Sequence, residues 1–401
     1  MTPWLHVVGI GAEGLAGLAP AARAVVENAE VLIGGKRHLA MVPEGPAERL
    51  VWGTPLEDTV KEIAARRGRR VAVLATGDPM FYGVGATLAR HFDGTDMAVL
   101  PHPGAFSLAC ARLNWPFADV ETLSLHGRAA ETMKLFMAPG ARLLILAENC
   151  DTPARVAALL TEAGYGPSTI TVLENMDSSE ERRTDGIAEN WDAPRGHDLN
   201  TIAVECRTAP GAKLTSRVPG LPDDAFEHDG QITKREVRAV TLAALAPLAG
   251  ETLWDIGAGA GSVAIEWLRA APRTQAHAIE RDADRCTMMA RNAMALGVPH
   301  LDIITATAPD GLSGLDRPNA VFIGGGLGQP GLIETAWDAL PAGGRLVANA
   351  VTVEGEAAQT RGVAAHGGEL RRIAISRAEP LGARQGWRPL RPVSQWAAVK
   401  T

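Results

Sequence analysis

A strand, a glycine turn and a helix follow one another without interruption between Leu253 and Leu268. The apolar run ends in Asp255, glycines stand at positions 257, 259 and 261, and the residues from Val263 onward have helical spacing. Such a turn lets a ligand approach the backbone closely, because glycine has no Cβ, and it directs N–H groups at that ligand. Nucleotides bind at turns of this kind in open α/β sheets. We therefore expect a doubly wound sheet around this turn.

The spacing of the glycines narrows the choice of ligand. A dinucleotide fingerprint needs its third glycine at position 262, where this chain has a serine. The turn instead resembles the first motif of class I S-adenosylmethionine (SAM) methyltransferases. Another nucleotide site and a purely structural turn are the alternatives that the motif leaves open. In the resemblance, the cofactor residues are Asp255, Gly257, Ala258, Gly259, Ala260 and Gly261.

Alternating strands and helices continue on both sides of this turn. The strand Ala276–Ile279 ends in Glu280, an acidic residue at the distance that typically binds ribose hydroxyls. Ala308 follows the next strand, where the class I fold lays the adenine edge. Thr233 has the spacing of a helix N-cap, with Glu236 closing a capping box. The segments 370–376 and 395–399 are expected to close the sheet as an antiparallel hairpin.

Basic side chains gather around the start of that helix. A single basic side chain in such a place usually lies on the surface in contact with water. Several together can instead neutralise the carboxylates of a ligand. Glycines 324–326 end a strand and offer no donor or acceptor side chain. This flat surface suits a large flat substrate with a carbon nucleophile. The candidate substrate residues here are His228, Lys234, Arg235 and Arg238.

The first half of the chain has three strands that end in long loops rich in glycine and proline, near residues 9–14, 76–83 and 101–107. Any one of these loops can be an ordinary connection between a strand and a helix, without a ligand-binding role. Together they resemble the tetrapyrrole methylase family over residues 4–206, which implies two α/β subdomains holding SAM in the cleft between them. His126 and Arg128 are further substrate candidates, with a solvated turn as the alternative. The resemblance assigns SAM binding to Gly9, Gly11, Gly77, Asp78, Pro79, Pro103, Gly104, Ala105 and Ser107.

Length and composition set the remaining limits. A chain of 401 residues is expected to form two domains, here 1–206 and 221–401 with a linker at 207–220. The net charge of −7 argues against a nucleic-acid partner. The four cysteines lie far apart, without the spacing of metal ligands. No stretch is apolar over the ~20 residues of a membrane helix, so we expect a cytoplasmic protein without a metal or a membrane partner.

Two unrelated SAM-binding folds in one chain resemble one family in particular, the precorrin-6Y C(5,15)-methyltransferases (decarboxylating) of cobalamin biosynthesis. The stretches 220–226, 228–236 and 253–267 carry this resemblance. It implies two SAM sites per chain, an acidic tetrapyrrole substrate, and loss of carbon dioxide from the acetate on ring C. We assign carbon 5 to residues 1–206, and carbon 15 with the decarboxylation to residues 221–401. We also expect a homo-oligomer.

The expected methyl transfer does not require a nucleophile–base pair, and the sequence indicates none. Methyl transfer from a sulfonium to an electron-rich carbon needs alignment more than a strong base, and we identify no nucleophile–base pair, so no catalytic residue is assigned. Two other classes stay open. A nicotinamide-dependent reductase would place Glu280 on a ribose and would bind NADH, and a non-catalytic tetrapyrrole carrier would not bind SAM tightly.

Overall fold

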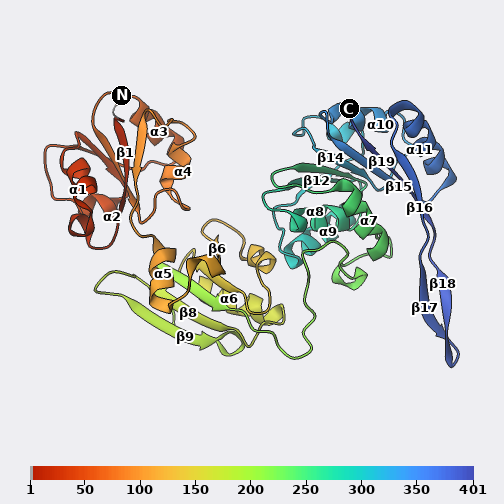
Figure 1. Cartoon of the computed structure of the whole chain (residues 1–401), viewed down its shortest axis with the longest axis horizontal. Coiled ribbons are helices and arrows are strands. Elements are labelled where there is room, and N and C mark those ends of the chain that lie inside the picture. Colours follow the sequence, from red (N-terminus) through yellow and green to blue (C-terminus); the bar gives the residue numbers. More distant parts are fainter. Residues whose placement is uncertain (1–2) are drawn as a thin grey trace. The chain divides into compact units, whose positions relative to one another are not determined.

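The computed structural model describes residues 3–401 and contains two compact units (Figure 1). One unit comprises the residues up to Ala130 together with Phe136–Ala212. The other comprises Glu131–Leu135 and Lys213–Thr401. The chain therefore changes unit inside the segment 207–220, and it also does so briefly at 131–135, where no break in the sequence pattern indicates a boundary.

The first unit begins with a parallel five-stranded sheet of order β3-β2-β4-β1-β5. Strand β1 lies between β4 and β5 and is apolar apart from His6, as expected for a strand with both faces covered. Leu5 and Val7 join one hydrophobic cluster, while Val8 and Ile10 join another. The strands are β1 (Leu5–Ile10), β2 (Val31–Gly34), β3 (Glu48–Val51), β4 (Val71–Thr76) and β5 (Met97–Leu100). The helices are α1 (Pro20–Glu27), α2 (Lys36–Ala40), α3 (Leu56–Ala64) and α4 (Val84–Leu88).

A second, mixed sheet completes this unit, with the order β6-β7-β10-β8-β9. Its strands are β6 (Val120–Ser124), β7 (Arg142–Leu146), β8 (Thr169–Glu174), β9 (Arg182–Ile187) and β10 (Asn200–Glu205). In this sheet β10 pairs antiparallel with both β7 and β8. Its helices are α5 (Ala105–Leu113) and α6 (Thr152–Glu162). Phe106 of α5 packs on Leu144 and Leu173 of the sheet.

The second unit is a seven-stranded sheet of order β13-β12-β11-β14-β15-β19-β16. The first five strands in this order are parallel, and β19 pairs antiparallel with both β15 and β16. The strands are β11 (Thr252–Ile256), β12 (Gln275–Glu280), β13 (Asp302–Thr305), β14 (Ala320–Ile323), β15 (Arg345–Ala350), β16 (Glu369–Ile373) and β19 (Val393–Val399). The expected closing antiparallel pair is confirmed.

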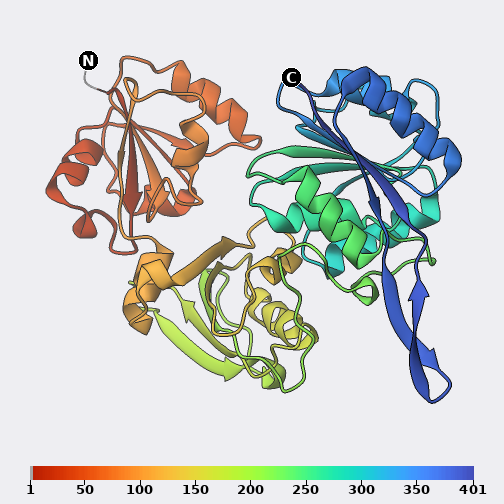
Figure 2. The same cartoon turned by 45° about the vertical axis from the view of Figure 1, so that its right-hand side comes forward.

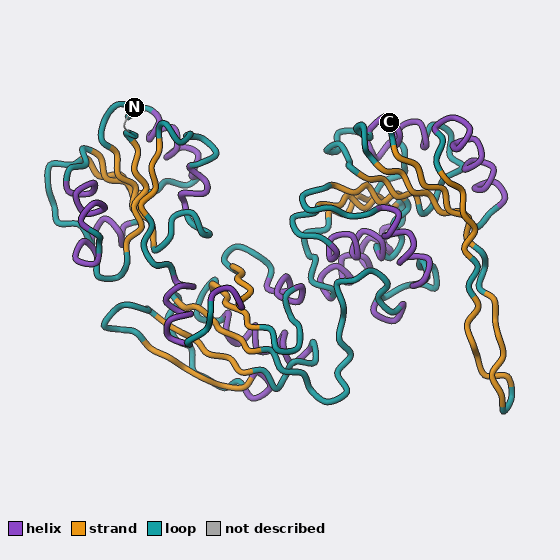
Figure 3. The backbone as a smooth tube through the Cα atoms, in the orientation of Figure 1, coloured by secondary structure: helices purple, strands orange, loops and turns teal. Residues whose placement is uncertain are grey.

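Helices cover both faces of this sheet, as Figure 3 shows. The helices are α7 (Arg235–Leu245), α8 (Ser262–Ala270), α9 (Ala283–Ala295), α10 (Leu332–Ala339) and α11 (Val353–His366). Leu253 of β11 packs with α7, α8 and α9, whereas Trp254 and Ile256 pack with α10 and α11. The sheet is thus doubly wound, as expected, and its strand order reverses between β11 and β14, where such folds bind ligands.

A two-stranded arm interrupts the pair β16 and β19 and extends away from the helices of its unit (Figure 2). It consists of β17 (Ser376–Leu381) and β18 (Arg384–Pro389), which pair antiparallel. Trp387 is 78% exposed and Leu381 is 70% exposed on this arm. Across residues 3–401 no helix combines the length and the apolar content needed to span a membrane.

Candidate functional site

The glycine turn after β11 has the backbone that the sequence indicates. Gly257, Gly259 and Gly261 have φ values of 71°, 59° and 77°, a region that strains residues with a side chain. A Cβ on Gly257 would lie 2.8 Å from the backbone nitrogen of Gly325. The turn and the glycine run after β14 therefore meet backbone to backbone at the point where the strand order reverses.

Two carboxylates support this turn from below. Glu280 is 6% exposed, and its two oxygens accept hydrogen bonds from the backbone nitrogens of Gly259 (2.9 Å) and Asp282 (3.1 Å). Asp255 accepts from the backbone nitrogen of Ala264 at 2.9 Å. Burial, with a smaller contribution from Glu280, raises the pKa of Asp255 to about 7. Glu280 reaches the cleft described next, whereas Asp255 lies beneath the turn.

A cleft of about 990 Å³ opens above the ends of these strands. Its lining includes the acidic side chain of Glu280 and the backbone of glycines 324–326. Gly261 and Asp255 do not line it, so their part is to shape the turn rather than to face a ligand. The expected cofactor residues that do line the cleft are Thr233, Gly257, Ala258, Gly259, Ala260, Glu280 and Ala308.

Of the four basic residues expected around the start of α7, only Lys234 lines this cleft. His228 and Arg235 do not line it. Arg238 is fully buried, and its guanidinium donates to Glu266 at 2.6 Å and to Asp223 at 3.4 Å. The expectation that Arg238 meets a substrate is therefore wrong, because its donors are used within the fold.

The expected capping box at α7 is also wrong. The helix begins at Arg235 after Lys234, and the side chain that accepts from the backbone nitrogen of Arg235 is Asp223, at 2.9 Å. Glu236 instead forms an ion pair with Arg377 at 2.7 Å. A carboxylate twelve residues away thus supplies the cap that the local spacing assigned to Thr233.

Three other arginines line the cleft without having been identified from the sequence, namely Arg281, Arg285 and Arg391. Arg285 is neutralised by Asp229 at 2.8 Å. No ion pair or hydrogen bond of the side chains of Arg281 and Arg391 is recorded within residues 3–401. No local sequence pattern marks these two residues, because the strand order alone brings them to the cleft.

The three loops of the first unit meet at the carboxyl ends of β4, β1 and β5. A Cβ on Gly9 would overlap the carbonyl oxygen of Gly77, and one on Gly77 would lie 2.6 Å from the Cα of Gly104. Gly77 also donates to Ile10 at 3.1 Å and accepts from His102 at 3.3 Å. These loops come from strands that are neighbours in the sheet, so residues almost a hundred positions apart form one floor. Gly11, Asp78, Pro79, Pro103, Ala105 and Ser107 lie on these loops or at their ends.

An exposed aromatic surface adjoins these loops. Phe81, Tyr82 and Phe117 are 43%, 44% and 49% exposed. The Arg128 guanidinium lies 5.3 Å from the centre of the Tyr82 ring, and Tyr82 has the uncommon φ of 54°. Arg128 thus lies beside the loop that contains Asp78, and His126 is exposed on the same turn.

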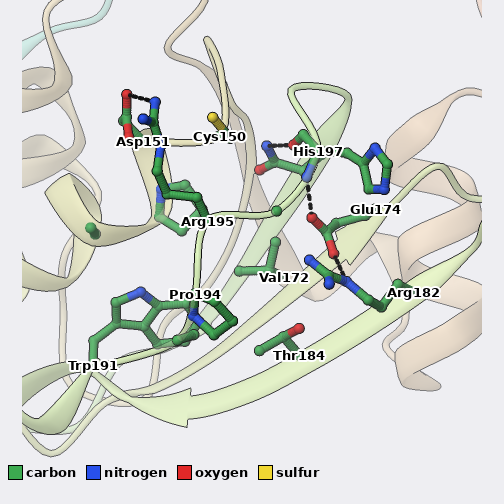
Figure 4. Close-up of a pocket in the computed structure, with 15 residues that line it drawn as sticks. Cys150, Asp151, Val172, Glu174, Arg182, Thr184, Trp191, Pro194, Arg195 and His197 are labelled. Carbon is green, nitrogen blue, oxygen red and sulfur yellow. Dashed lines mark hydrogen bonds and ion pairs between the residues drawn. The ribbon is translucent and has the colours of Figure 1, made fainter.

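A much smaller cavity, of about 50 Å³, lies against β8 and β9 (Figure 4). Its charges are already paired: Glu174 with Arg182, and Arg195 with Asp151 at 2.6 Å. The cavity has room for only a few water molecules. Within residues 3–401 no group of three or more His, Cys, Asp or Glu side chains is placed to hold a metal ion.

Comparison with known proteins matches each half of the chain to a family. Residues 4–189 match the tetrapyrrole (corrin/porphyrin) methylases, and residues 224–400 match the family described as precorrin methyltransferase domain. Over 403 aligned residues, the chain is 46% identical to the precorrin-6Y C(5,15)-methyltransferase (decarboxylating) of Sinorhizobium sp. This alignment covers 100% of this chain and 97% of that protein.

Two shorter relatives each match less than half of the chain. The cobalt-precorrin-7 C(5)-methyltransferase of Salmonella typhimurium is 34% identical over 178 residues, which are 44% of this chain and 88% of that protein. The probable cobalt-precorrin-6B C(15)-methyltransferase (decarboxylating) of Saccharolobus solfataricus is 34% identical over 143 residues, which are 34% of this chain and 72% of that protein.

Proposed function

Since the chain belongs to the precorrin-6Y C(5,15)-methyltransferase (decarboxylating) family, we propose that it transfers methyl groups from SAM to carbons 5 and 15 of precorrin-6Y and removes carbon dioxide from the ring C acetate. The observation that carries this proposal is the presence of two separate sets of closely packed glycine loops at the carboxyl ends of parallel strands. We call each set a glycine floor: Gly9, Gly77 and Gly104 form that of the first unit, and Gly257 with glycines 324–326 forms that of the second. Each floor is suited to one methyl donor, so one chain can serve two methylations.

The residues of the second unit fit SAM. Gly257 lies too close to Gly325 to carry a Cβ, the position of a Cβ on Gly259 is open space in the lining of the cleft, and Glu280 offers a carboxylate to ribose hydroxyls. Bound SAM supplies a methyl group on a sulfonium, whose departure leaves a neutral thioether. The protein then has to align the two reactants and exclude water. Because the leaving group is neutral, the methyl transfer itself does not require a base, and we propose none.

The first unit is proposed to hold the second SAM on the floor formed by Gly9, Gly77 and Gly104. The close approach of these three backbones leaves no room for larger residues. Arg128 and the exposed rings of Tyr82 and Phe117 provide a flat surface with a cation next to this floor. This combination suits a flat substrate that has acidic side chains.

We assign carbon 5 to the first unit, and carbon 15 with the decarboxylation to the second. Carbon 15 borders ring C, so methylation there makes the ring next to the acetate electron-poor. The electron pair of the breaking carbon–carboxylate bond can then move into the ring as carbon dioxide leaves. The names and short lengths of the two shorter relatives support a division of the two methylations between separate parts of the chain.

We also propose that the chain forms a homo-oligomer. The exposed Trp387 and Leu381 on the β17–β18 arm support this proposal, because a two-stranded hairpin with free apolar side chains is marginally stable alone in water.

Mass analysis of the product formed from precorrin-6Y and SAM tests the function, together with calorimetry of SAM binding. We expect two SAM per chain, and a product with two added methyl groups and without one carboxyl group. NADH binding in place of SAM binding would indicate the reductase, and tetrapyrrole binding without SAM binding would indicate the carrier.

Gly77→Val and Gly257→Val in the full chain are reciprocal controls, because each is expected to block one floor and leave the other intact. Each variant should bind one SAM. The Gly257→Val product should retain its carboxylate and lack the carbon 15 methyl group, whereas the Gly77→Val product should lack only the carbon 5 methyl group. Carbon dioxide release by Gly257→Val at the wild-type rate would contradict the assignment.

A further inference from the structure

The order of the strands divides the large cleft into two sides, and only one of them is used by the proposed cofactor. Glu280 ends β12 and Ala308 follows β13, and both strands lie on the same side of β11. The other side lies above β14, β15 and β19. Residues 324–329 and 349–352, together with Arg391 and Val393, line the cleft there. This argument rests on the proposed function, because it takes Glu280 to hold the ribose of SAM.

The free side of the cleft has an apolar surface. Val351 lines the cleft and is 48% exposed, and Val353, the first residue of α11, is 80% exposed next to it in the chain. Ile375 and Leu390 line the cleft from the two short segments that link the arm to β16 and β19. Exposed apolar side chains concentrated beside a cleft mark a binding surface, because they are otherwise unfavourable in water.

The base of the arm holds this surface in place. Leu390 donates its backbone N–H to Ile375 at 2.8 Å, which joins the two strands where they leave the sheet. One step closer to the sheet, Ile373 pairs with Val393. The residues that link the arm to the sheet are therefore held close to β16 and β19. We name Val351, Ile375, Leu390 and Arg391 the substrate wall.

Arg391 is the cation of this wall. It is exposed, and no ion pair or hydrogen bond of its side chain is recorded in residues 3–401. Arg377 and Arg388 of the arm are paired, with Glu236 at 2.7 Å and with Glu379 at 3.0 Å, and Arg384 of the arm does not line the cleft. An arginine left without a carboxylate beside an apolar surface can bind a carboxylate of a ligand through two parallel hydrogen bonds.

We propose that the substrate wall receives the face of the tetrapyrrole, and that Arg391 pairs with one of its side-chain carboxylates. Lys234 lines the same cleft from the start of α7 and can take a second carboxylate. Together these contacts orient the macrocycle in its plane above glycines 324–326. Arg391 is thus a positioning residue for the carbon 15 methylation.

The test compares Arg391→Gln and Arg391→Lys with the control Arg388→Gln in the full chain. Arg391→Gln should raise KM for precorrin-6Y about ten- to a hundredfold, the effect of losing one charged hydrogen-bonded pair. Calorimetry should give an unchanged Kd for SAM, and Arg391→Lys should recover part of the affinity. Arg388→Gln, which alters an exposed arginine of the same arm, should change neither value.

A second variant tests the apolar part of the wall without disturbing the core. Val351→Glu places a negative charge on a half-exposed position, so the fold should be retained while the affinity for the acidic tetrapyrrole falls. Unchanged KM in both Arg391→Gln and Val351→Glu would overturn the inference, as would an equal effect of Arg388→Gln.

Absorbance titration of precorrin-6Y needs no turnover and separates this inference from the proposed function. Equal affinity of the wild type and Arg391→Gln overturns the substrate wall. Weaker binding by Arg391→Gln, combined with a wild type that does not methylate, supports the wall and overturns the proposed function.

Discussion

At the scale of single residues, Glu280 combines a structural role with a proposed ligand role. Its place at the end of β12 is enough to predict a ribose acceptor, because the strand and the glycine turn are local patterns. Its bonds to Gly259 and Asp282 are not predictable in the same way, since they depend on how the turn folds back over the strand end.

Glu280→Ala should therefore weaken SAM binding in the second unit and also destabilise the glycine turn. Loss of a charged acceptor should cost ~1.5–3 kcal/mol of binding free energy, or about one to two decades in Kd. Calorimetry measures the affinity and thermal unfolding measures the stability. Glu354→Ala, at the other side of the cleft, is the control, and an unchanged affinity in Glu280→Ala would remove the residue from the site.

Asp255 should make the stability of the second unit depend on pH. Burial raises its pKa from 3.8 to about 7, so the folded state binds the proton more tightly than the unfolded state. Its contribution to stability is full below pH 4 and is lost as the pH rises through 7, an effect on the order of 4 kcal/mol at most.

Asp255→Asn removes this titration and keeps an oxygen to accept from Ala264. Urea unfolding at pH 5 and pH 8 should show the wild type losing more stability over this interval than the variant. Parallel losses in the two proteins would show that Asp255 does not titrate in this range.

Arg238 shows where residue-level prediction fails. A cation at the start of a helix is usually solvated, and only the tertiary placement of Glu266 and Asp223 buries this one. A buried arginine is stable when its hydrogen bonds are satisfied, but its partners lie 28 and 15 positions away, so no local pattern identifies them.

At the scale of elements, the loops of the first unit are more tightly constrained than their sequence motifs suggest. Gly9→Ala should displace the loop of Gly77, because the added Cβ overlaps its carbonyl oxygen. Strain of this kind typically costs about 1–3 kcal/mol.

We expect Gly9→Ala to lower the stability of the unit and to reduce SAM binding from two sites to one. Gly45→Ala is the matched control, since no atom lies within 4 Å of its added Cβ. Calorimetry of both variants makes the comparison, and two intact sites in Gly9→Ala would contradict the proposed floor.

Most strands around the two floors could be predicted, because glycine turns and apolar runs are local signals. The arm could not, because Leu381 and Trp387 are the only large apolar residues of β17 and β18, too few for the pattern of a strand packed on a core. The start of α7 was misplaced for a related reason, since its cap comes from Asp223 rather than from the helix itself.

At the scale of the whole molecule, a division of the chain at residue 212 does not separate the two units completely. Glu131–Leu135 belong with the second unit, so a fragment beginning at 213 lacks five of that unit's residues. Variants of the full chain are therefore sharper tests of the two activities than fragments. Composition and length predict two units, but they carry no information about such an exchange.

The arm should govern assembly of the whole chain. Leu381→Ser combined with Trp387→Ser should reduce the molecular mass measured by light scattering, because the apolar surface proposed to meet another copy is removed. Leu248→Ser changes a leucine that is 60% exposed elsewhere on the unit, and it should leave the mass unchanged. A wild type that is monomeric at every concentration would refute the proposed homo-oligomer.

The position of the arm also affects how the enzyme can change. Ile373 and Val393 pair directly across β16 and β19, so everything between them can be lengthened, shortened or exchanged without shifting the register of the main sheet. The glycine floor of the second unit, in contrast, tolerates little variation, because Gly257 and Gly325 pack backbone against backbone. Substrate preference can therefore diversify by replacement of one short insertion while methyl-donor recognition is inherited intact, and a graft of residues 374–392 from a relative is a practical route to altered specificity.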